Sequence, residues 1–315
     1  MKEGIVTKST GKWYDIQLED GKTIKSQIKG KFRLDGMDLT NPVAVGDKVL
    51  VNLGKDETGM ITKIMDRENY VIRQSPRKKH QLHLMASNID HAIVIMTIVN
   101  PMLKQGFIDR YLLMVEPYNI PTTIVFNKAD LYDDEALDTF AMLYEIYTKI
   151  GYNVLLVSAI ERKGLNQLKD LLKNKITLVS GQSGVGKSTL INALQPQLEL
   201  RTQEISDYSG KGQHTTTFAE MFTLSFGGQI IDTPGIKSLS FNHLEPADIA
   251  HNFREFFELS DKCKFGGSCL HRNEPNCAVK EALQTGEISE LRYFNYLTLL
   301  EEAEEQNYWE RKKNF

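Results

Sequence analysis

The sequence predicts a doubly wound α/β domain of the P-loop type between an N-terminal all-β, OB-fold-like barrel and a mostly helical C-terminal region. Three observations carry this prediction. Short strands separated by glycines fill residues 1–68, and continuous apolar runs alternate with helix-length segments from Ile89 onward. The strands stop after Gly235, where the sequence becomes helical and contains an insert rich in cysteine and histidine.

The α/β prediction depends on runs that are apolar at nearly every position, as expected for parallel strands covered by helices on both faces. Segments 137–147 and 165–172 have the length and amphipathic pattern of the covering helices. The expected strands are 92–99, 122–126, 154–157, 176–179 and 229–231.

The N-terminal region is predicted to be a small closed barrel, because five short strands occupy about 70 residues without a convincing helix. An OB-fold is the commonest barrel of this kind, and an SH3-like barrel is the alternative. The basic stretch 73–80 contains Pro76 and is expected to be a linker or a mobile loop. The expected strands are 4–7, 13–18, 22–26, 47–53 and 60–65.

Composition favours a soluble, cytoplasmic protein that does not enter a membrane. Of the 315 residues, 41% are hydrophobic and 25% charged, which is ordinary for folded domains. The longest apolar stretch, 92–99, is far shorter than the roughly 20 residues of a membrane helix. Residues 1–80 hold 16 Lys and Arg against 11 Asp and Glu, within a chain of net charge −3. This basic region could face a phosphate backbone, although an ordinary solvated surface explains the charge equally well.

A phosphate-binding loop is predicted where an expected strand meets an expected helix. The glycines of such a loop let backbone N–H groups turn toward the β-phosphate, Lys187 reaches the β- and γ-oxygens, and the Ser188 hydroxyl coordinates magnesium. The predicted phosphate contacts are Gly181, Gln182, Ser183, Gly184, Val185, Gly186, Lys187, Ser188 and Thr189.

A guanine-reading motif, Asn127-Lys128-Ala129-Asp130, follows the expected strand 122–126. The Asp130 carboxylate can accept hydrogen bonds from both N1–H and the exocyclic amine of guanine, whereas adenine offers a lone pair at N1. Four residues are a weak signal alone and a strong one beside a P-loop. Ser158 and Ala159, at the end of the next strand, match the auxiliary motif that contacts guanine through backbone amides.

The expected strand 229–231 leads into Asp232-Thr233-Pro234-Gly235, which resembles switch II of GTPases. Asp232 would hold magnesium through water, and the Gly235 amide would sense the γ-phosphate. The polar segment 210–217 is the corresponding switch I candidate. One of its three threonines, for which we favour Thr216, would complete the magnesium shell.

The residue after switch II, Ile236, cannot orient the attacking water as the glutamine found there in many GTPases does. Either a partner completes the site or another residue does so. His214 is the candidate, because an imidazole beside the magnesium threonine could swing toward the γ-phosphate. A purely structural loop histidine is the alternative.

A structural zinc site is predicted from the only three cysteines in the chain and one histidine, all within 15 residues. Three thiolates and an imidazole complete a tetrahedral shell and leave no position for water. Free thiols or a redox cluster are the alternatives. The ligands are Cys263, Cys269, His271 and Cys277.

The order of the motifs is inverted, because the guanine-reading motif precedes the P-loop that it follows in ordinary GTPases. With these parts in this order, the chain resembles the bacterial circularly permuted GTPases of the ribosome small subunit-dependent GTPase A family along nearly its whole length. The aliphatic Ile236 and the switch I histidine His214 match that family. The first cysteine gap is five residues here where the family usually shows four, which alters the shape of the metal loop.

The resemblance implies an OB-fold-like RNA-binding barrel at 1–68, a circularly permuted GTPase domain at 69–235 and a zinc-binding helical domain at 236–315. It implies GTP or GDP, Mg²⁺ and one structural Zn²⁺ as ligands, and the small ribosomal subunit, through its RNA and proteins, as partner. Such proteins act in late assembly or as checkpoint factors, with hydrolysis stimulated by the subunit and linked to release. We expect a monomer.

The permutation has a mechanical consequence, because the chain leaves the GTPase domain soon after Gly235 and reaches Cys263 within 28 residues. We expect switch II movement to pull directly on the zinc domain. Two other functions stay open from the sequence. One is an RNA-binding module that binds GTP with negligible turnover, and the other is a GTPase of the large subunit.

Overall fold

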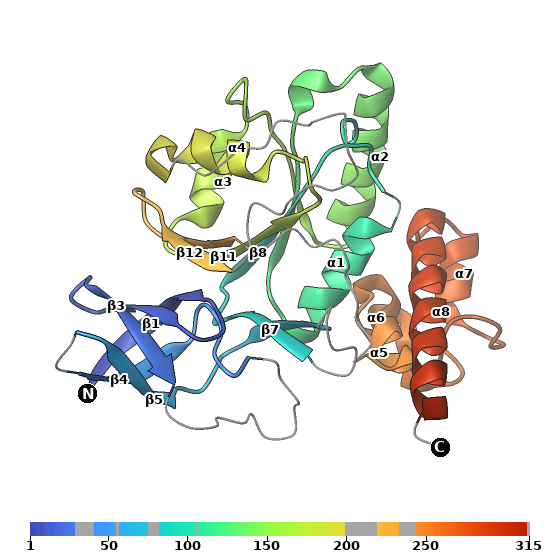
Figure 1. The fold of residues 1–315 in the computed structure, drawn as a ribbon. Helices are drawn as coiled ribbons and strands as arrows, with labels where there is room; N and C mark the ends of the chain where they lie inside the picture. Colours follow the sequence, from blue (N-terminus) through green and yellow to red (C-terminus); the bar gives the residue numbers. More distant parts are fainter. Residues whose placement is uncertain are drawn as a thin grey trace.

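The computed structural model describes residues 1–28, 41–54, 57–74, 82–104, 106–198, 219–232 and 244–313. A barrel, an α/β domain and a group of C-terminal helices lie beside one another (Figure 1). The strands are β1 (Lys2–Ser9), β2 (Tyr14–Leu18), β3 (Thr23–Ile28), β4 (Lys48–Leu53), β5 (Gly59–Ile64), β6 (Tyr70–Gln74), β7 (Leu82–Ser87), β8 (His91–Met96), β9 (Thr122–Phe126), β10 (Asn153–Leu156), β11 (Ile176–Gly181), β12 (Glu220–Thr223) and β13 (Gln229–Asp232). The helices are α1 (Phe107–Val115), α2 (Asp134–Lys149), α3 (Leu165–Leu172), α4 (Lys187–Leu194), α5 (Pro246–His251), α6 (Arg254–Ser260), α7 (Ala278–Gln284) and α8 (Glu290–Lys313), with 3-10 turns η1 (Glu116–Tyr118), η2 (Ala129–Leu131), η3 (Pro196–Leu198) and η4 (Gly266–Ser268).

The N-terminal barrel is closed, as the sequence predicts. Its strands pair in the order β1-β2-β3-β5-β4, and β1 returns to pair with β4. The five strands lie within two residues of the predicted ranges. Alternate side chains such as Val6, Ile16 and Ile61 point inward and are fully buried. This is the partly parallel five-stranded barrel of OB-folds, because β3 and β5 run parallel while the other pairs are antiparallel.

The α/β sheet has the order β10-β9-β8-β11-β13-β12, in which only the edge strand β12 is antiparallel. Strands β9 and β10 lie on one side of the central strand β8. Strands β13 and β12 lie on the other side, beyond β11. The direction of winding therefore reverses between β8 and β11, which is the switch point where such sheets bind ligands.

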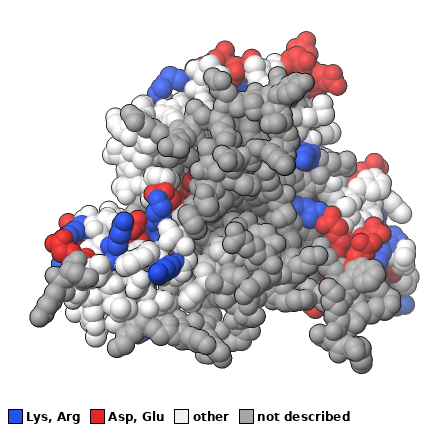
Figure 2. Space-filling model, viewed as in Figure 1, with Lys and Arg blue, Asp and Glu red and all other residues white. Residues whose placement is uncertain are grey.

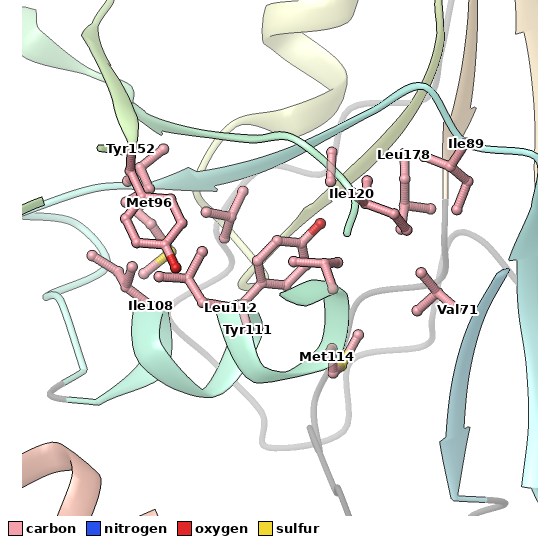
Figure 3. Packing of buried hydrophobic residues seen from close by; sticks show 14 of the residues in the cluster. Val71, Ile89, Met96, Ile108, Tyr111, Leu112, Met114, Ile120, Tyr152 and Leu178 are labelled. Atoms are coloured by element: carbon pink, nitrogen blue, oxygen red, sulfur yellow. The ribbon is translucent and has the colours of Figure 1, made fainter. Parts of the chain in front are cut away.

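Helices cover both faces of this sheet. Helices α1 and α2 pack on the face of Val94 and Met96, and α3 and α4 pack on the face of Ile93 and Ile95. Figure 3 shows the first layer, in which Tyr111 and other α1 residues lie beneath the strands. Burial of both faces explains why these strands are apolar at most positions.

The predicted linker at 73–80 is wrong at its start. Arg73 and Gln74 belong to β6, where they pair with His83 and Leu82 of β7. The aromatic and β-branched residues that precede them form the strand, so local β-propensity extends further than the charge pattern suggests. The rest of that stretch, 75–80, lies outside the described residues.

Hydrogen bonds around Asp47 and strand pairing at the barrel edge are among the contacts that attach the barrel to the α/β domain. The buried Asp47 carboxylate accepts hydrogen bonds from Arg67 Nε and Ser87 Oγ, both at 2.6 Å. At the edge of the barrel, Lys8 of β1 pairs with Glu220 of β12, and their side chains form a 3.0 Å ion pair. The pairing of β1 with β12 joins the barrel and the α/β sheet into one 11-stranded sheet.

A buried ionic network holds the C-terminal helices on the α/β domain. Arg292 of α8 is 2% exposed and donates to Asp109 of α1 at 2.6 Å and, with two nitrogens, to Glu255 of α6 at 2.7 and 2.9 Å. Asn295 and the Tyr147 hydroxyl also donate to the Asp109 carboxylate. The two carboxylates are therefore satisfied by one guanidinium and two neutral donors.

We predict that Arg292→Ala lowers the free energy of unfolding by about 3 to 5 kcal/mol, because it leaves two carboxylates buried without their cation. Chemical denaturation measures the change. Lys22→Ala is the matched control, since its ion pair with Glu57 is exposed, and it should cost at most about 1 kcal/mol. Equal effects of the two substitutions would contradict the role of the network.

His91 is a second buried group whose charge affects stability. Its ring is 4% exposed, and Nε2 lies 3.0 Å from Thr123 Oγ1. Burial, assisted by the nearby Lys175 ammonium, lowers the pKa of His91 from 6.5 to about 4. The unfolded chain therefore takes up a proton near pH 6.5, whereas the folded chain does so only near pH 4.

The free energy of unfolding should accordingly fall as pH decreases from about 6.5 to about 4. We predict that His91→Gln removes about 2.5 kcal/mol of the loss that the wild-type chain shows between pH 7.5 and 4.5. The comparison of the two proteins by denaturation at each pH cancels the other titrating groups. Parallel pH profiles would show that His91 does not contribute.

Candidate nucleotide site and metal centre

The predicted P-loop connects β11 to α4 at the switch point of the sheet. Gly186 stands at the helix N-cap with φ +87°, and a Cβ atom there would lie 2.7 Å from Asn127 Nδ2. A side chain is therefore excluded both by backbone conformation and by space. The helix has no side-chain cap, so its first N–H groups are available to an anion.

Lys187 lies inside this loop. Its Nζ donates to the carbonyl oxygens of Gly181 and Gln182 at 2.9 and 2.8 Å. Burial lowers the pKa of Lys187, and the Asp232 carboxylate opposes that effect. The ammonium group can pass from these carbonyls to the oxygens of a phosphate held by the same loop.

Asn127 connects the motifs that are inverted in the sequence. Its Nδ2 donates to Val185 O of the P-loop at 2.9 Å, and its Oδ1 accepts from the amide of Ala159 at 3.3 Å. Its own amide continues the sheet by donating to Met96 O at 2.8 Å. One buried side chain thus brings the P-loop and both predicted guanine-contact segments together.

The other side chains that the sequence predicts to read guanine are held by neighbouring segments. Lys128 adopts φ +64° and donates from Nζ to Asn100 O at 2.7 Å. Burial lowers the pKa of Lys128, while Asp130 opposes the shift. The Ser158 hydroxyl donates to the Asp130 carboxylate. Asp130 is therefore held by the segment that the sequence predicts to contact guanine beside it.

The magnesium ligands predicted from sequence are only partly described. Asp232 ends β13 in register with Val179 of the adjacent β11, and Ser188 lies in the first turn of α4. Their oxygen atoms are the ligand type that Mg²⁺ takes. The remaining predictions in the two switches fall outside the described residues, namely His214, Thr215, Thr216, Thr217, Gly235 and Ile236.

The cysteine and histidine side chains form a compact buried cluster. The four ligand atoms of Cys263, Cys269, His271 and Cys277 all lie within 4.8 Å of one another. His271 Nδ1 is 3.4 Å from Cys277 Sγ, and the sulfurs of Cys263 and Cys277 are 3.9 Å apart. Zn–S bonds of about 2.3 Å at tetrahedral angles give separations of about 3.8 Å between sulfurs, so the cluster fits a zinc ion.

The metal loop is held by α8. The hydroxyls of Tyr293 and Tyr296 donate to the carbonyl oxygens of His271 and Leu270 at 2.7 and 2.6 Å. Burial raises the pKa of Cys269 to about 12, so a cation is needed to keep its sulfur a thiolate near neutral pH. The lengthened gap after Cys263 contains the turn η4 and does not prevent the four ligands from meeting.

Sequence reasoning missed one contributor to the nucleotide site and the residue that anchors the C-terminal helices. The carbonyl oxygen of Asn100 accepts a hydrogen bond from Lys128 Nζ. Asn100 follows a central strand at the switch point of the sheet, and this position was the signal that could have indicated a role in the site. The buried Arg292 gave no such signal, because an arginine on an amphipathic helix is usually exposed.

The sheet order, the P-loop at the switch point and the guanine-reading motif at the end of the neighbouring strand define a P-loop GTPase whose chain is circularly permuted. Sequence profiles agree: that of the RsgA GTPase matches residues 64–242, and that of the RsgA N-terminal domain matches residues 3–61.

Curated relatives and solved structures extend the match to nearly the whole chain. The small ribosomal subunit biogenesis GTPase RsgA of Flavobacterium psychrophilum is 51% identical over 96% of this chain and 93% of its own, and that of Bacteroides fragilis is 47% identical over 97% and 98%. The crystal structure of YjeQ from Thermotoga maritima has a TM-score of 0.76 and 34% identity over 96% of this chain and 98% of its own. YloQ, described as a circularly permuted GTPase, has a TM-score of 0.73 and 31% identity over 97% and 96%.

The chain therefore belongs to the RsgA GTPase family and is a GTPase. The family resemblance and the permuted fold predicted from sequence are confirmed. Membership implies a guanine nucleotide and Mg²⁺ as ligands. Among the helices of the described ranges, none is long and apolar enough to cross a membrane.

We predict that the protein binds one zinc ion per chain. The His271→Ala variant should lose the zinc and have a lower thermal midpoint, because the three remaining ligands bind the ion too weakly to neutralise the charge of the buried sulfurs. Metal analysis of the purified proteins measures the stoichiometry. His251→Ala is the matched control, since His251 lies beside the same loop with its Nε2 at 2.8 Å from Gly267 O but outside the cluster. Retention of zinc by His271→Ala would refute the ligand assignment.

Proposed function

We propose that this protein hydrolyses GTP as a late assembly or checkpoint factor of the small ribosomal subunit, that the subunit stimulates hydrolysis, and that hydrolysis is coupled to release. The observation that carries the proposal is the match, over nearly the full chain, to relatives named small ribosomal subunit biogenesis GTPases. We further propose that the protein is a cytoplasmic monomer.

In this proposal the guanine base is read by Asp130, with Lys128 and the amides of Ser158 and Ala159 beside it. The P-loop residues 181–189 hold the phosphates through backbone N–H groups and Lys187. Ser188, Asp232 and Thr216 would hold magnesium, which would supply positive charge to the β- and γ-phosphate oxygens. The bond from Asn127 to the P-loop supports this arrangement, since it sets the distance between the base and phosphate contacts.

We assign His214 to the hydrolysis step, where its imidazole would orient or accept a proton from the attacking water. Ile236 supports this assignment, because an aliphatic side chain can do neither. The Gly235 amide would report the presence of the γ-phosphate.

The proposed domains are an RNA-binding barrel at 1–68, the GTPase domain at 69–235 and the zinc domain at 236–315. RNA binding by the barrel is supported by its closed five-stranded, OB-fold-like architecture rather than by the charge of its described surface. Figure 2 shows basic and acidic side chains interspersed there. Four of the seven described barrel lysines form ion pairs with acids, namely Lys2–Asp20, Lys8–Glu220, Lys22–Glu57 and Lys48–Glu68.

We also propose that nucleotide state reaches the zinc domain through the junction after switch II. The described chain resumes at residue 244, and α5 begins at Pro246, eleven positions beyond Gly235. Helix α5 packs on α8, which holds the metal loop. A short connection of this kind can transmit a pull. Insertion of a flexible linker after Ile236 should therefore abolish nucleotide-dependent release from the subunit.

The proposal predicts GTP turnover that rises by at least about tenfold with purified small subunits. It also predicts co-sedimentation with the small subunit in a non-hydrolysable GTP analogue and release in GDP. Large subunits serve as the matched control. Preferential binding to the large subunit, or turnover that small subunits do not change, would contradict the proposed function.

The His214→Ala variant tests the hydrolysis step separately. Its subunit-stimulated turnover should be about 100-fold lower than that of wild type, as expected for loss of a general acid or base. Its affinity for the GTP analogue should stay within about twofold of wild type. Unchanged stimulated turnover would eliminate this role for His214 and leave the rest of the proposal intact.

A further inference from the structure

A tyrosine hydroxyl interrupts the hydrogen-bond ladder of the central sheet beside the guanine-reading loop. Strands β8 and β9 pair in parallel up to Met96 and Phe126, and the Asn127 amide adds one more bond to Met96 O at 2.8 Å. In a continued parallel ladder the Ile98 amide would donate to Asn127 O. Instead, the Ile98 amide donates to the Tyr132 hydroxyl at 2.9 Å, and that hydroxyl donates to Asn127 O at 3.0 Å.

The inserted hydroxyl also closes the guanine-reading loop on itself. Asp130 lies in the single turn η2, and Tyr132 follows that turn as its C-cap, with its amide on Ala129 O. The bond from the Tyr132 hydroxyl back to Asn127 O therefore joins the two ends of the loop that contains Lys128 and Asp130.

The same hydroxyl sets the distance between this loop and the segment after β8. That segment provides the carbonyl of Asn100, which accepts from Lys128 Nζ at 2.7 Å. Within it, Leu103 donates to Ile98 O at 3.0 Å, and the Thr97 hydroxyl donates to Pro101 O at 2.6 Å. The Ile98 amide is thus part of an ordered turn. The Tyr132 hydroxyl is held by this amide on one side and by Asn127 O on the other.

We propose that Tyr132 is a positioning residue for guanine recognition, acting through its hydroxyl, which holds the 127–130 loop at the separation from the 97–101 segment that aims Lys128 and Asp130 at the base. This inference rests on the guanine-binding function proposed above. Tyr132 forms no hydrogen bond with the P-loop or with the predicted magnesium ligands in the described residues, so its effect should fall mainly on base recognition.

The state of the hydroxyl suits this role. The ring is half-buried against the core beneath the sheet. Burial raises the pKa of Tyr132 to about 12, with the Ile98 amide acting in the opposite direction. The hydroxyl therefore keeps its proton at neutral pH and can donate to Asn127 O while accepting from Ile98. Phenylalanine at this position would keep the ring but would remove the hydroxyl that the Ile98 amide and Asn127 O both contact.

The test compares Tyr132→Phe with wild type in the full-length, zinc-loaded protein, using GDP, IDP and ADP as probes. Inosine lacks the exocyclic amine that Asp130 reads, so the ratio of the dissociation constants for IDP and GDP reports how well the loop is aimed. Loss of two hydrogen bonds predicts an approximately tenfold higher Kd for GDP and a ratio reduced by about threefold or more. The subunit-stimulated kcat at saturating GTP should stay within about twofold, so that the change falls on KM.

Tyr147→Phe is the matched control, because it removes a buried hydroxyl that donates to Asp109 at 2.6 Å in the interface with α8. It should lower the thermal midpoint and leave the Kd for GDP and the IDP-to-GDP ratio unchanged. The thermal midpoint of Tyr132→Phe confirms that this variant is folded.

An unchanged Kd for GDP in folded Tyr132→Phe would overturn the inference, and so would a weaker Kd with an unchanged IDP-to-GDP ratio. A wild-type protein that binds ADP as tightly as GDP would overturn the guanine assignment itself, and this inference with it. The two failures are therefore distinguishable in one experiment.

Discussion

The nucleotide pocket depends on the side-chain amide of Asn127. With one atom it binds the P-loop at Val185, and with another it binds the segment that begins at Ser158. These segments are distant in sequence and in inverted order, yet a pocket requires only that they meet in space. Position 186 must be a glycine, because that amide occupies the place that a side chain there would take. The permutation therefore leaves the chemistry intact, since the bonds that assemble the pocket do not depend on the direction in which the chain visits them.

Permutation instead determines what is attached to the sheet. The chain ends of the α/β domain lead to the barrel and to the zinc region, and a buried carboxylate fixes each of them, Asp47 through its bond from Ser87 and Asp109 through its ion pair with Arg292. The zinc region is thus held on α1 as well as connected to switch II. A movement of switch II that displaces the zinc region must either move α1 with it or break the buried ion pair between Asp109 and Arg292. Breaking such a pair costs much free energy. The barrel meets β12, which lies between the two predicted switches in the sequence, so both flanking regions join the domain close in sequence to a predicted switch.

The sequence predicted most of the sheet because its strands are buried on both faces. The run 122–126 coincides with β9, and the barrel strands agree to within two residues. Strand β12 was missed because a four-residue edge strand with polar positions has too little pattern. The motif residues could be predicted because phosphate and guanine chemistry restricts residue types. Their supports were not, since Val185 O, Asn100 O and the amide of Ile98 are backbone atoms that no residue identity reveals. Arg292 and Asp109 are 183 positions apart, and only the fold brings them together.

The most direct test of the assembled pocket is the base selectivity of an Asp130→Asn variant, measured as Kd for GDP and for XDP. Xanthine replaces the exocyclic amine of guanine with a carbonyl oxygen, to which an asparagine amide can donate while its oxygen accepts from N1–H. If Asn127 and Ser158 hold residue 130 against the base, GDP affinity should fall by about 100-fold and the preference should reverse in favour of XDP. An Asp130→Asn protein that still prefers GDP to XDP would contradict the account, because residue 130 would then not face the base.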